Sequence, residues 1–278
     1  MSLEAAHSRR TAPQLQELAK QIRRDILTMT SEAGSGHPGG SLSACDFTVA
    51  LYFGVLRHDP ANPAWEDRDY VFFSKGHIAP LQYACLARAG YFPVDHLWTL
   101  RRLGSILQGH PNMHETPGVE VSSGSLGQGL SVASGACLGL RKRGLPNRVY
   151  CILGDGELQE GQVWEAAMAA AHFKLDNLCA IVDYNGLQID GPVSEVMGLS
   201  PLAEKWRAFG WNVIEIDGHD MEAILAAYAK ASASKGRPAV IVARTVKGKG
   251  VSFMENDADW HGKAPNREQL EAALAELR

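Results

Sequence analysis

The sequence predicts an α/β protein built on a doubly wound, mostly parallel sheet with helices on both faces. Short β-rich runs alternate with longer helical patterns along most of the chain, which favours a parallel sheet. Four of the five runs are near-continuously apolar, as is typical of strands covered by helices on both sides. The expected strands cover residues 70–74, 149–153, 178–184, 211–216 and 239–245.

Helical patterns fill most of the segments between these strands. The first begins at Pro13, a residue suited to an opening helical turn, and its apolar residues keep helical spacing as far as Met29. The last, "NREQLEAALAELR", can be capped by Asn266, with Gln269 completing a capping box. No internal repeat or clear linker divides the chain, so we expect one domain over residues 1–278. The other expected helices cover about 41–53, 127–143, 158–173, 201–209 and 220–233.

Composition and charge exclude several classes of function. The 278 residues are 45% hydrophobic with a net charge of −4, and no basic patch or acidic tail indicates a nucleic acid or a membrane surface as partner. No run is long enough to span a bilayer, and the N-terminal "MSLEAAHSRRTAPQ" lacks the apolar core of a secretory signal. The five cysteines have no paired spacing, which favours buried free thiols over disulfides or a zinc site. We therefore expect a cytoplasmic protein.

A carboxylate follows the second expected strand, in "ILGDGELQEGQVWEA" (152–166). Ligands of doubly wound sheets bind outside the carboxyl ends of the strands, where Asp155 lies. The helix expected from Glu157 onward has free N–H groups that favour an anion. A carboxylate beside an anion makes sense when a divalent cation lies between them, and Mg²⁺ takes oxygen ligands from proteins and phosphates.

A second polar turn, "DYNGLQID", follows the next expected strand. Its Asn185 amide oxygen is a candidate second metal ligand, and the Gly186 turn lets the Leu187 carbonyl supply a third. Together the two motifs predict a metal-bound diphosphate held by Asp155 with help from Asn185. From these residues alone, a pair of ordinary turns remains the alternative. The dinucleotide fingerprint G-x-G-x-x-G is absent from this stretch.

The stretch "GDGELQEGQVWEAAMAAAHFKLDNLCAIVDYNGLQIDG" resembles the thiamine-diphosphate motif, and its particular residues resemble those of the transketolase family. Further motifs occur in the order and spacing of that family over nearly the whole chain. They are "GSGHPGGSLS" (34–43), "DYVFFSKGHIAPLQYACLARAG" (69–90), "GHP" (109–111), "SSGSLGQGLSVASG" (122–135) and "DWHG" (259–262). The resemblance is to the N-terminal, diphosphate-binding half of a transketolase, and it implies the thiamine-diphosphate-binding fold.

The resemblance also implies roles for individual residues. Asp155, Asn185 and the Leu187 carbonyl would hold Mg²⁺, for which Ca²⁺ can substitute. His37, His110 and His261 would face the sugar substrate and the reacting carbons. Glu160 would meet its counterpart across a dimer interface. The residues that would contact thiamine diphosphate are His77, Gly124, Ser125, Leu126, Gly156, Glu157, Asn185 and His261.

Two positions depart from the common pattern of full-length members of the family. Ser125 stands where they have Pro, and Gly186 stands where they have His after the metal-binding Asn. Both changes are similar to those of two-subunit members, and they weaken any inference about which sugar is used. Lys247 and Lys249 in "TVKGKG" either approach a phosphate or form a solvated turn.

The chain stops at Arg278, just after the helix that ends the first half in the family. There, a glutamate of the second, pyrimidine-binding domain contacts the aminopyrimidine and drives deprotonation of the cofactor. The resemblance therefore implies a chain that needs a separate C-terminal subunit to transfer a two-carbon ketol unit from a ketose phosphate to an aldose acceptor. Self-association of this chain into a dimer core would give a two-plus-two heterotetramer.

Two other functions remain alternatives. The α chain of a 2-oxo acid dehydrogenase, or a fragment of a deoxyxylulose-phosphate synthase, would share the GDG…N core. The motifs "GSGHPGG" and "LQEGQVWEAAMAAAHFKLDNL" favour transketolase over both. A non-catalytic cofactor-binding module would have little need of His37, His110 and His261 on the substrate side.

Overall fold

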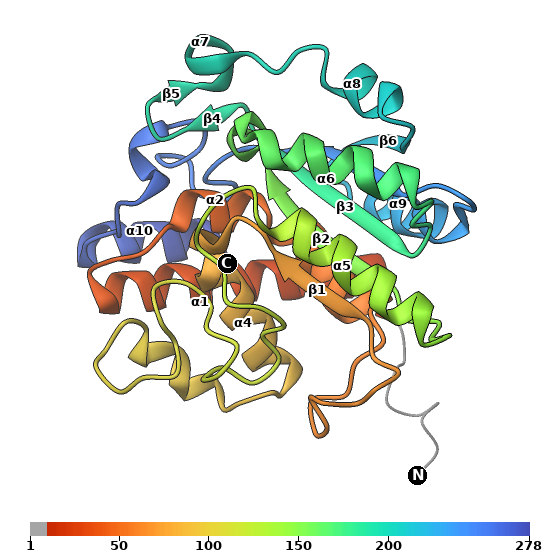
Figure 1. The fold of residues 1–278 in the computed structure, drawn as a ribbon. Helices are drawn as coiled ribbons and strands as arrows, with labels where there is room; N and C mark the ends of the chain where they lie inside the picture. Colours follow the sequence, from red (N-terminus) through yellow and green to blue (C-terminus); the bar gives the residue numbers. More distant parts are fainter. Residues whose placement is uncertain (1–9) are drawn as a thin grey trace.

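The predicted fold class is confirmed by the computed structural model, which describes residues 10–278 (Figure 1). Its main sheet has five strands in the order β1-β2-β3-β7-β6, and every neighbouring pair is parallel. All five expected strands are present, each end lying within one residue of its prediction. Their bounds are β1 (Tyr70–Phe73), β2 (Val149–Gly154), β3 (Leu178–Tyr184), β6 (Asn212–Asp217) and β7 (Ala239–Arg244).

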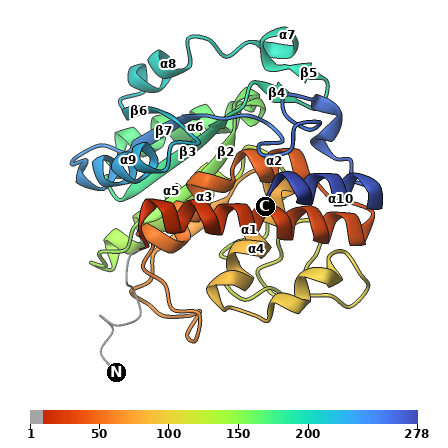
Figure 2. The same cartoon turned by 180° about the vertical axis from the view of Figure 1, so that it is seen from behind.

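Helices cover both faces of this sheet, because successive strand residues point to opposite sides. In β2, Tyr150 and Ile152 belong to one buried cluster, whereas Cys151 and Leu153 belong to the other. The second cluster is completed by α5 (Gly129–Lys142), α6 (Gly161–His172) and α8 (Leu202–Ala208), with α5 and α6 in front of the sheet in Figure 1. The first is completed by α1 (Ala12–Ala33), α4 (Ala79–Ala89), α9 (Met221–Ala233) and α10 (Arg267–Glu276), which Figure 2 shows from the other side.

The order of the strands explains this distribution of helices. From β1 through β2 to β3 the chain advances across the sheet in one direction, whereas from β6 to β7 it moves back in the other. Right-handed crossovers then place α9 and α6 on opposite faces. All five strands still point the same way, so their carboxyl ends share one edge of the sheet.

Some helices differ from the sequence expectations. The helix expected over 41–53 is divided into α2 (Pro38–Ser43), α3 (Cys45–Ala50) and a π-helical turn at Leu51–Val55. The helix expected over 158–173 begins only at Gly161, because Gly156–Gln159 form a separate 3₁₀ turn. The remaining short elements are α7 (Val193–Met197), the antiparallel pair β4 (Leu187–Gln188) and β5 (Gly191–Pro192), and 3₁₀ turns at Gly76–Ile78, Val94–Thr99 and Ala258–His261.

Other expectations are confirmed. The Asn266 side chain accepts from the Gln269 N–H, and the Gln269 side chain accepts from the Asn266 N–H, which completes the capping box of α10. All five cysteines are buried and free. Within residues 10–278, no helix is both long and apolar enough to cross a membrane. Residues 1–9, the first part of the stretch that argues against a secretory signal, lie outside the described residues.

A buried polar network joins α1, α3 and the loops after β6 and β7. The two terminal nitrogens of Arg23 donate to the Asp46 carboxylate at 2.9 and 2.7 Å. The same carboxylate lies 2.7 Å from His219 Nδ1, and Arg23 Nε donates to the Lys249 carbonyl at 3.0 Å. Burial alone would raise the pKa of Asp46, but the Arg23 guanidinium and His219 lower it to about 2. The network therefore fixes the loop that carries Lys247.

Replacing Asp46 with Ala should destabilise the fold strongly, because it leaves the Arg23 guanidinium buried without its carboxylate. We expect the free energy of unfolding to fall by about 3–5 kcal/mol, measured by chemical denaturation. Glu204→Ala is the matched control: it removes a carboxylate from the exposed Arg207–Glu204 pair and should cost less than about 1 kcal/mol. Equal losses in the two variants would contradict this account of the network.

Candidate active site

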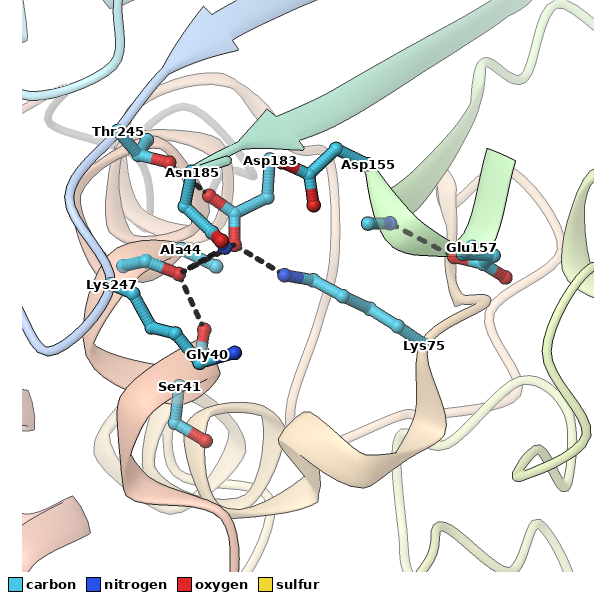
Figure 3. Close-up of polar contacts among 12 residues, drawn as sticks. Gly40, Ser41, Ala44, Lys75, Asp155, Glu157, Asp183, Asn185, Thr245 and Lys247 are labelled. Atoms are coloured by element: carbon cyan, nitrogen blue, oxygen red, sulfur yellow. Dashed lines mark hydrogen bonds and ion pairs between the residues drawn. The ribbon is translucent and has the colours of Figure 1, made fainter. Parts of the chain in front are cut away.

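Polar side chains that follow four of the strands meet at the shared carboxyl edge of the sheet. Lys75 follows β1, Asp155 follows β2, Asn185 follows β3, and Lys247 follows β7. Figure 3 shows these side chains directed toward a common space, with Asp183 at the end of β3 among them. The position expected from the sequence for Asp155 and Asn185 is therefore the position that they occupy.

The Asp155 carboxylate is buried and held by backbone groups. Its two oxygens accept from the N–H groups of Gly156 at 2.8 Å and Gly186 at 2.5 Å. Burial and the neighbouring Asp183 carboxylate raise the pKa of Asp155 to about 6, against the lowering effect of those two hydrogen bonds. A cation placed beside this carboxylate would favour its ionised form.

Asn185 and Leu187 supply the other oxygens that the sequence predicts. The Asn185 amide oxygen accepts from the Leu187 N–H at 3.0 Å, so the two residues form one tight turn. The Leu187 carbonyl accepts from the Lys247 ammonium at 3.3 Å, which places a positive charge beside it. Within residues 10–278 no group of three or more His, Cys, Asp and Glu side chains could hold a metal ion. The candidate ligands are thus one carboxylate, one amide and one carbonyl, a set of hard oxygens suited to Mg²⁺ or Ca²⁺.

Four histidines from separate segments gather beside these oxygens. The ring centroid of His37 lies 5.3 Å from that of His77, 6.4 Å from that of His110 and 5.5 Å from that of His261. The rings of His77 and His261 are 5.0 Å apart. His37 Nδ1 is buried and has no hydrogen-bond partner, so a polar group of a ligand can pair with it.

These imidazoles are held in the neutral form. Burial, with the charge of Arg101 as the next cause, lowers the pKa of His37 to about 4. Burial and Lys247 lower the pKa of His261 to about 3. Burial also lowers the pKa of His77 well below its usual value and that of His110 to a lesser extent. Neutral imidazoles can both donate and accept hydrogen bonds.

A close backbone approach builds one wall of the site. A Cβ at Gly76 would lie 2.6 Å from Ser123 Oγ and 2.7 Å from Gly124 N, so only glycine lets the His77 turn contact this segment. At Gly124, where φ is +155°, a Cβ would lie 3.3 Å from the His110 ring. Ser125 is exposed and Leu126 is half-buried. The structure thus brings Gly124, the first residue of the segment 124–126, against the histidine cluster.

The two glutamates that follow Asp155 have different surroundings. The buried Glu157 carboxylate accepts from Ser74 Oγ and from the N–H groups of Gly127 and Gly154, both at 2.9 Å. It is therefore engaged inside the protein. Glu160 is exposed and lies at the N-cap position, just before α6, without a capping hydrogen bond from its side chain. The helix expected over 158–173 would have placed it in the first turn, and that expectation is wrong.

Two features of the site are not determined by the sequence: the direction of the two lysines in "TVKGKG" and the partner of Asp183. Lys247 is 2% exposed and its ammonium lies 2.9 Å from His261 Nδ1, so the solvated turn is wrong for this residue. Lys249, in contrast, is partly exposed and pairs with Glu255 at 3.3 Å. The buried pair of Lys75 with Asp183 was not expected at all. The available signal was a carboxylate inside an apolar strand, because buried Asp residues are almost always paired.

Comparison with known proteins identifies the family. The family described as transketolase, thiamine diphosphate binding domain matches residues 15–277. The chain belongs to this family. The match extends through all five strands and every histidine of the cluster, and it confirms the resemblance seen in the sequence.

Two similar proteins are transketolase subunits of about the same length. A 6-deoxy-6-sulfo-D-fructose transketolase subunit from Clostridium sp. (strain MSTE9) is 48% identical, covering 95% of this chain and 96% of the relative. An apulose-4-phosphate transketolase subunit from Actinobacillus succinogenes (strain ATCC 55618 / DSM 22257 / CCUG 43843 / 130Z) is 43% identical with the same coverage.

Other relatives are longer. Transketolase from Homo sapiens is 39% identical, and the match covers 95% of this chain and 42% of the relative. The crystal structure of transketolase from Campylobacter jejuni subsp. jejuni NCTC 11168 is similar with a TM-score of 0.90 and 35% identity, again covering 95% of this chain and 42% of that one. The chain thus spans about two fifths of these proteins, and the thiamine-diphosphate-binding fold is confirmed.

The depressed histidine pKa values predict a pH-dependent stability. Above about pH 6.5, the usual pKa of the unfolded imidazole, His37 and His261 are neutral in both states and have no effect. Below it, the unfolded chain binds protons that the folded chain does not, so the free energy of unfolding should fall as the pH decreases toward 4.

Denaturation midpoints measured from about pH 7.5 to 4.5 test this expectation. The double variant His37→Asn/His261→Asn should lose less stability than the wild-type chain over that range. Parallel curves for the two proteins would show that these imidazoles titrate normally in the fold.

Proposed function

We propose that this chain is the N-terminal, thiamine-diphosphate-binding subunit of a two-chain transketolase. The observation that carries the proposal is the convergence of the Asp155, Asn185 and Leu187 oxygens with four neutral imidazoles at one edge of the sheet. With a separate C-terminal subunit, it would transfer a two-carbon ketol unit from a ketose phosphate to an aldose acceptor. The relatives of equal length, themselves named as subunits, support this division of the enzyme.

The residues at this edge fit a diphosphate bound through Mg²⁺. Asp155, Asn185 and the Leu187 carbonyl would hold the metal, and Ca²⁺ can substitute because it takes the same oxygen ligands. Gly156 and His77 would contact the diphosphate, and the buried Lys247 ammonium would balance its charge. Thiamine diphosphate, when bound, supplies the carbon that takes up the ketol unit and the electron sink for it.

The remaining predicted residues would orient the cofactor and the sugar. Gly124, Ser125 and Leu126 would lie against the aminopyrimidine end. His37, His110 and His261 would exchange hydrogen bonds and protons with the sugar hydroxyls, for which neutral imidazoles are suited. Glu157 would contribute through its backbone, since its carboxylate is already engaged with Ser74, Gly127 and Gly154.

The C-terminal subunit would supply the glutamate that contacts the aminopyrimidine and most of the groups that hold the sugar phosphate. We propose that this chain forms one domain, self-associates through a surface that includes the exposed Glu160, and assembles with its partner as a cytoplasmic two-plus-two heterotetramer. The two relatives of equal length are named for different ketoses, one sulfonated and one phosphorylated. A ketose that carries an anionic group, of which the ketose phosphate proposed above is one case, is therefore the donor class.

Isolation of the native assembly tests the division into two chains. The chain is recovered from its source cell with thiamine diphosphate and Mg²⁺ present, and each recovered protein is weighed and assayed for ketol transfer. We expect a stoichiometric partner of similar size, and activity only when both chains are present. Activity of this chain alone would contradict the proposal, as would oxidant-coupled decarboxylation of 2-oxo acids by the assembly.

Replacing Asp155 with Ala tests the metal site directly. The variant should bind Mg²⁺ more than about 100-fold more weakly at saturating thiamine diphosphate, because it loses the only carboxylate among the three ligands. Asp190→Ala, at an exposed carboxylate in the β4–β5 turn, is the matched control and should leave the affinity unchanged. Unchanged Mg²⁺ binding by the Asp155→Ala variant would exclude this site.

A further inference from the structure

Asp183 is the most heavily hydrogen-bonded carboxylate around the candidate site. It is fully buried near the end of β3, with its side chain at 0% exposure. One oxygen accepts from the Lys75 ammonium, from Ser43 Oγ at 2.5 Å and from the Asn185 amide nitrogen at 3.1 Å. The other oxygen accepts from Thr245 Oγ1. Figure 3 shows the carboxylate between Lys75, Asn185 and Thr245.

The partners of Asn185 determine which way its amide points. An amide has one accepting atom and one donating atom, and an ionised carboxylate only accepts. The Asn185 nitrogen must therefore face Asp183, and it also donates to Ser43 Oγ at 3.4 Å. On the opposite side, the Leu187 N–H donates to the Asn185 oxygen at 3.0 Å. The hydrogen bonds on both sides of the Asn185 amide therefore require the same orientation of that amide.

This orientation matters because a cation binds the amide oxygen and not the nitrogen. If the amide were rotated by half a turn, its NH₂ group would face the cation and the Leu187 N–H, and its oxygen would face the Asp183 carboxylate. We propose that Asp183 is a positioning residue that fixes the Asn185 amide with its oxygen toward the cation. The inference rests on the proposed Mg²⁺ site but assigns a role that lies outside the ligand set itself.

Lys75 and Thr245 have a supporting part in this arrangement. A buried carboxylate is costly unless it is paired, and the Lys75 ammonium compensates the charge of Asp183. Thr245 contacts only the oxygen that does not touch Asn185. The acceptor that orients the amide is thus one particular oxygen of Asp183. The effect of losing this acceptor can therefore be distinguished from a general effect of losing negative charge.

The test compares two substitutions of Asp183 in the full chain, reconstituted with its C-terminal partner. Mg²⁺ affinity is measured by titration at saturating thiamine diphosphate, without reference to turnover. Asp183→Ala removes the acceptor and should weaken Mg²⁺ binding by about 10–100-fold, as loss of a group that orients a metal ligand typically does. Asp183→Asn removes the charge, but its amide oxygen must face the donor-only Lys75 ammonium, so an acceptor for Asn185 remains. This variant should stay within about threefold of the wild-type affinity.

A second background separates orientation from electrostatics. In Asn185→Asp the ligand is a carboxylate, which presents an oxygen whichever way it turns. Adding Asp183→Ala to that background should therefore cost little or no Mg²⁺ affinity, in contrast to its effect beside the native amide. Asp190→Ala, which removes an exposed carboxylate outside this network, is the matched control and should leave the affinity at the wild-type value.

Three outcomes would overturn the proposal: no loss of affinity in Asp183→Ala, equal losses in Asp183→Ala and Asp183→Asn, or equal losses of Asp183→Ala in the two backgrounds. If Asp183→Ala does not fold with Lys75 unpaired, Lys75→Met is added to the Asp183→Ala proteins and their references in both backgrounds, and the two backgrounds are compared. The Asp183→Asn comparison is made only with Lys75 present, because its expected result depends on that ammonium. If the wild-type assembly binds no Mg²⁺ with thiamine diphosphate, the proposed function and this inference fall together. If the wild-type assembly binds Mg²⁺ but the variants give any of the three outcomes above, only this inference falls.

Discussion

The buried ion pair between Lys75 and Asp183 holds the segments of the candidate site together. Lys75 follows β1 and Asp183 belongs to β3, while the other donors to Asp183 come from α2, from Asn185 and from the residue after β7. Removing two charges from water costs several kcal/mol for each ion, so such a pair persists only when further hydrogen bonds satisfy it. Asp183 has these bonds, and they join three strands and a helix at one point.

The cost of burying charged groups also explains the distribution of charge at this edge of the sheet. Burial lowers the pKa of Lys247 to about 8, with the Lys75 charge as the next cause, while Asp155 and Asp183 act in the opposite direction. Positive and negative groups thus lie side by side, with neutral imidazoles next to them. A metal-bound diphosphate carries both signs of charge as well. An edge that already presents an acidic and a basic side needs little rearrangement to receive it, which is the general advantage of a preorganised polar site.

The sequence predicted those parts of the fold and site that depend on local pattern. Apolar runs define buried strands, so all five strands were found, and a polar residue directly after a strand has its position fixed by the strand. Asp155 and Asn185 are therefore placed by sequence alone. Lys75 and Asp183 are not, because they lie 108 residues apart and their pairing depends on which strands are neighbours.

Lys247 and Glu160 are two further residues whose positions the local sequence pattern does not determine. The motif "TVKGKG" contains two lysines that look equivalent in the sequence, yet only the first is turned inward. The Gly248 N–H donates to the Gly39 carbonyl at 3.0 Å, and Arg23 holds the Lys249 carbonyl, so contacts with α1 and α2 decide the direction of the loop. Similarly, helical periodicity continues through 158–160, but the 3₁₀ turn at Gly156–Gln159 moves the start of α6.

In the proposed assembly, the boundary between the two chains would divide the cofactor site without dividing its supporting network. Every donor to Asp155 and Asp183 named above belongs to this chain, as do all four histidines of the cluster. Ser125 and Glu160, in contrast, are exposed at its margin, where the aminopyrimidine end and the interface between chains are proposed to lie. The groups that must be rigid to hold a metal and a diphosphate are thus internal to one fold. The group proposed to activate the cofactor could then come from another chain, because it would act on the aminopyrimidine end, which is proposed to lie beside the exposed Ser125.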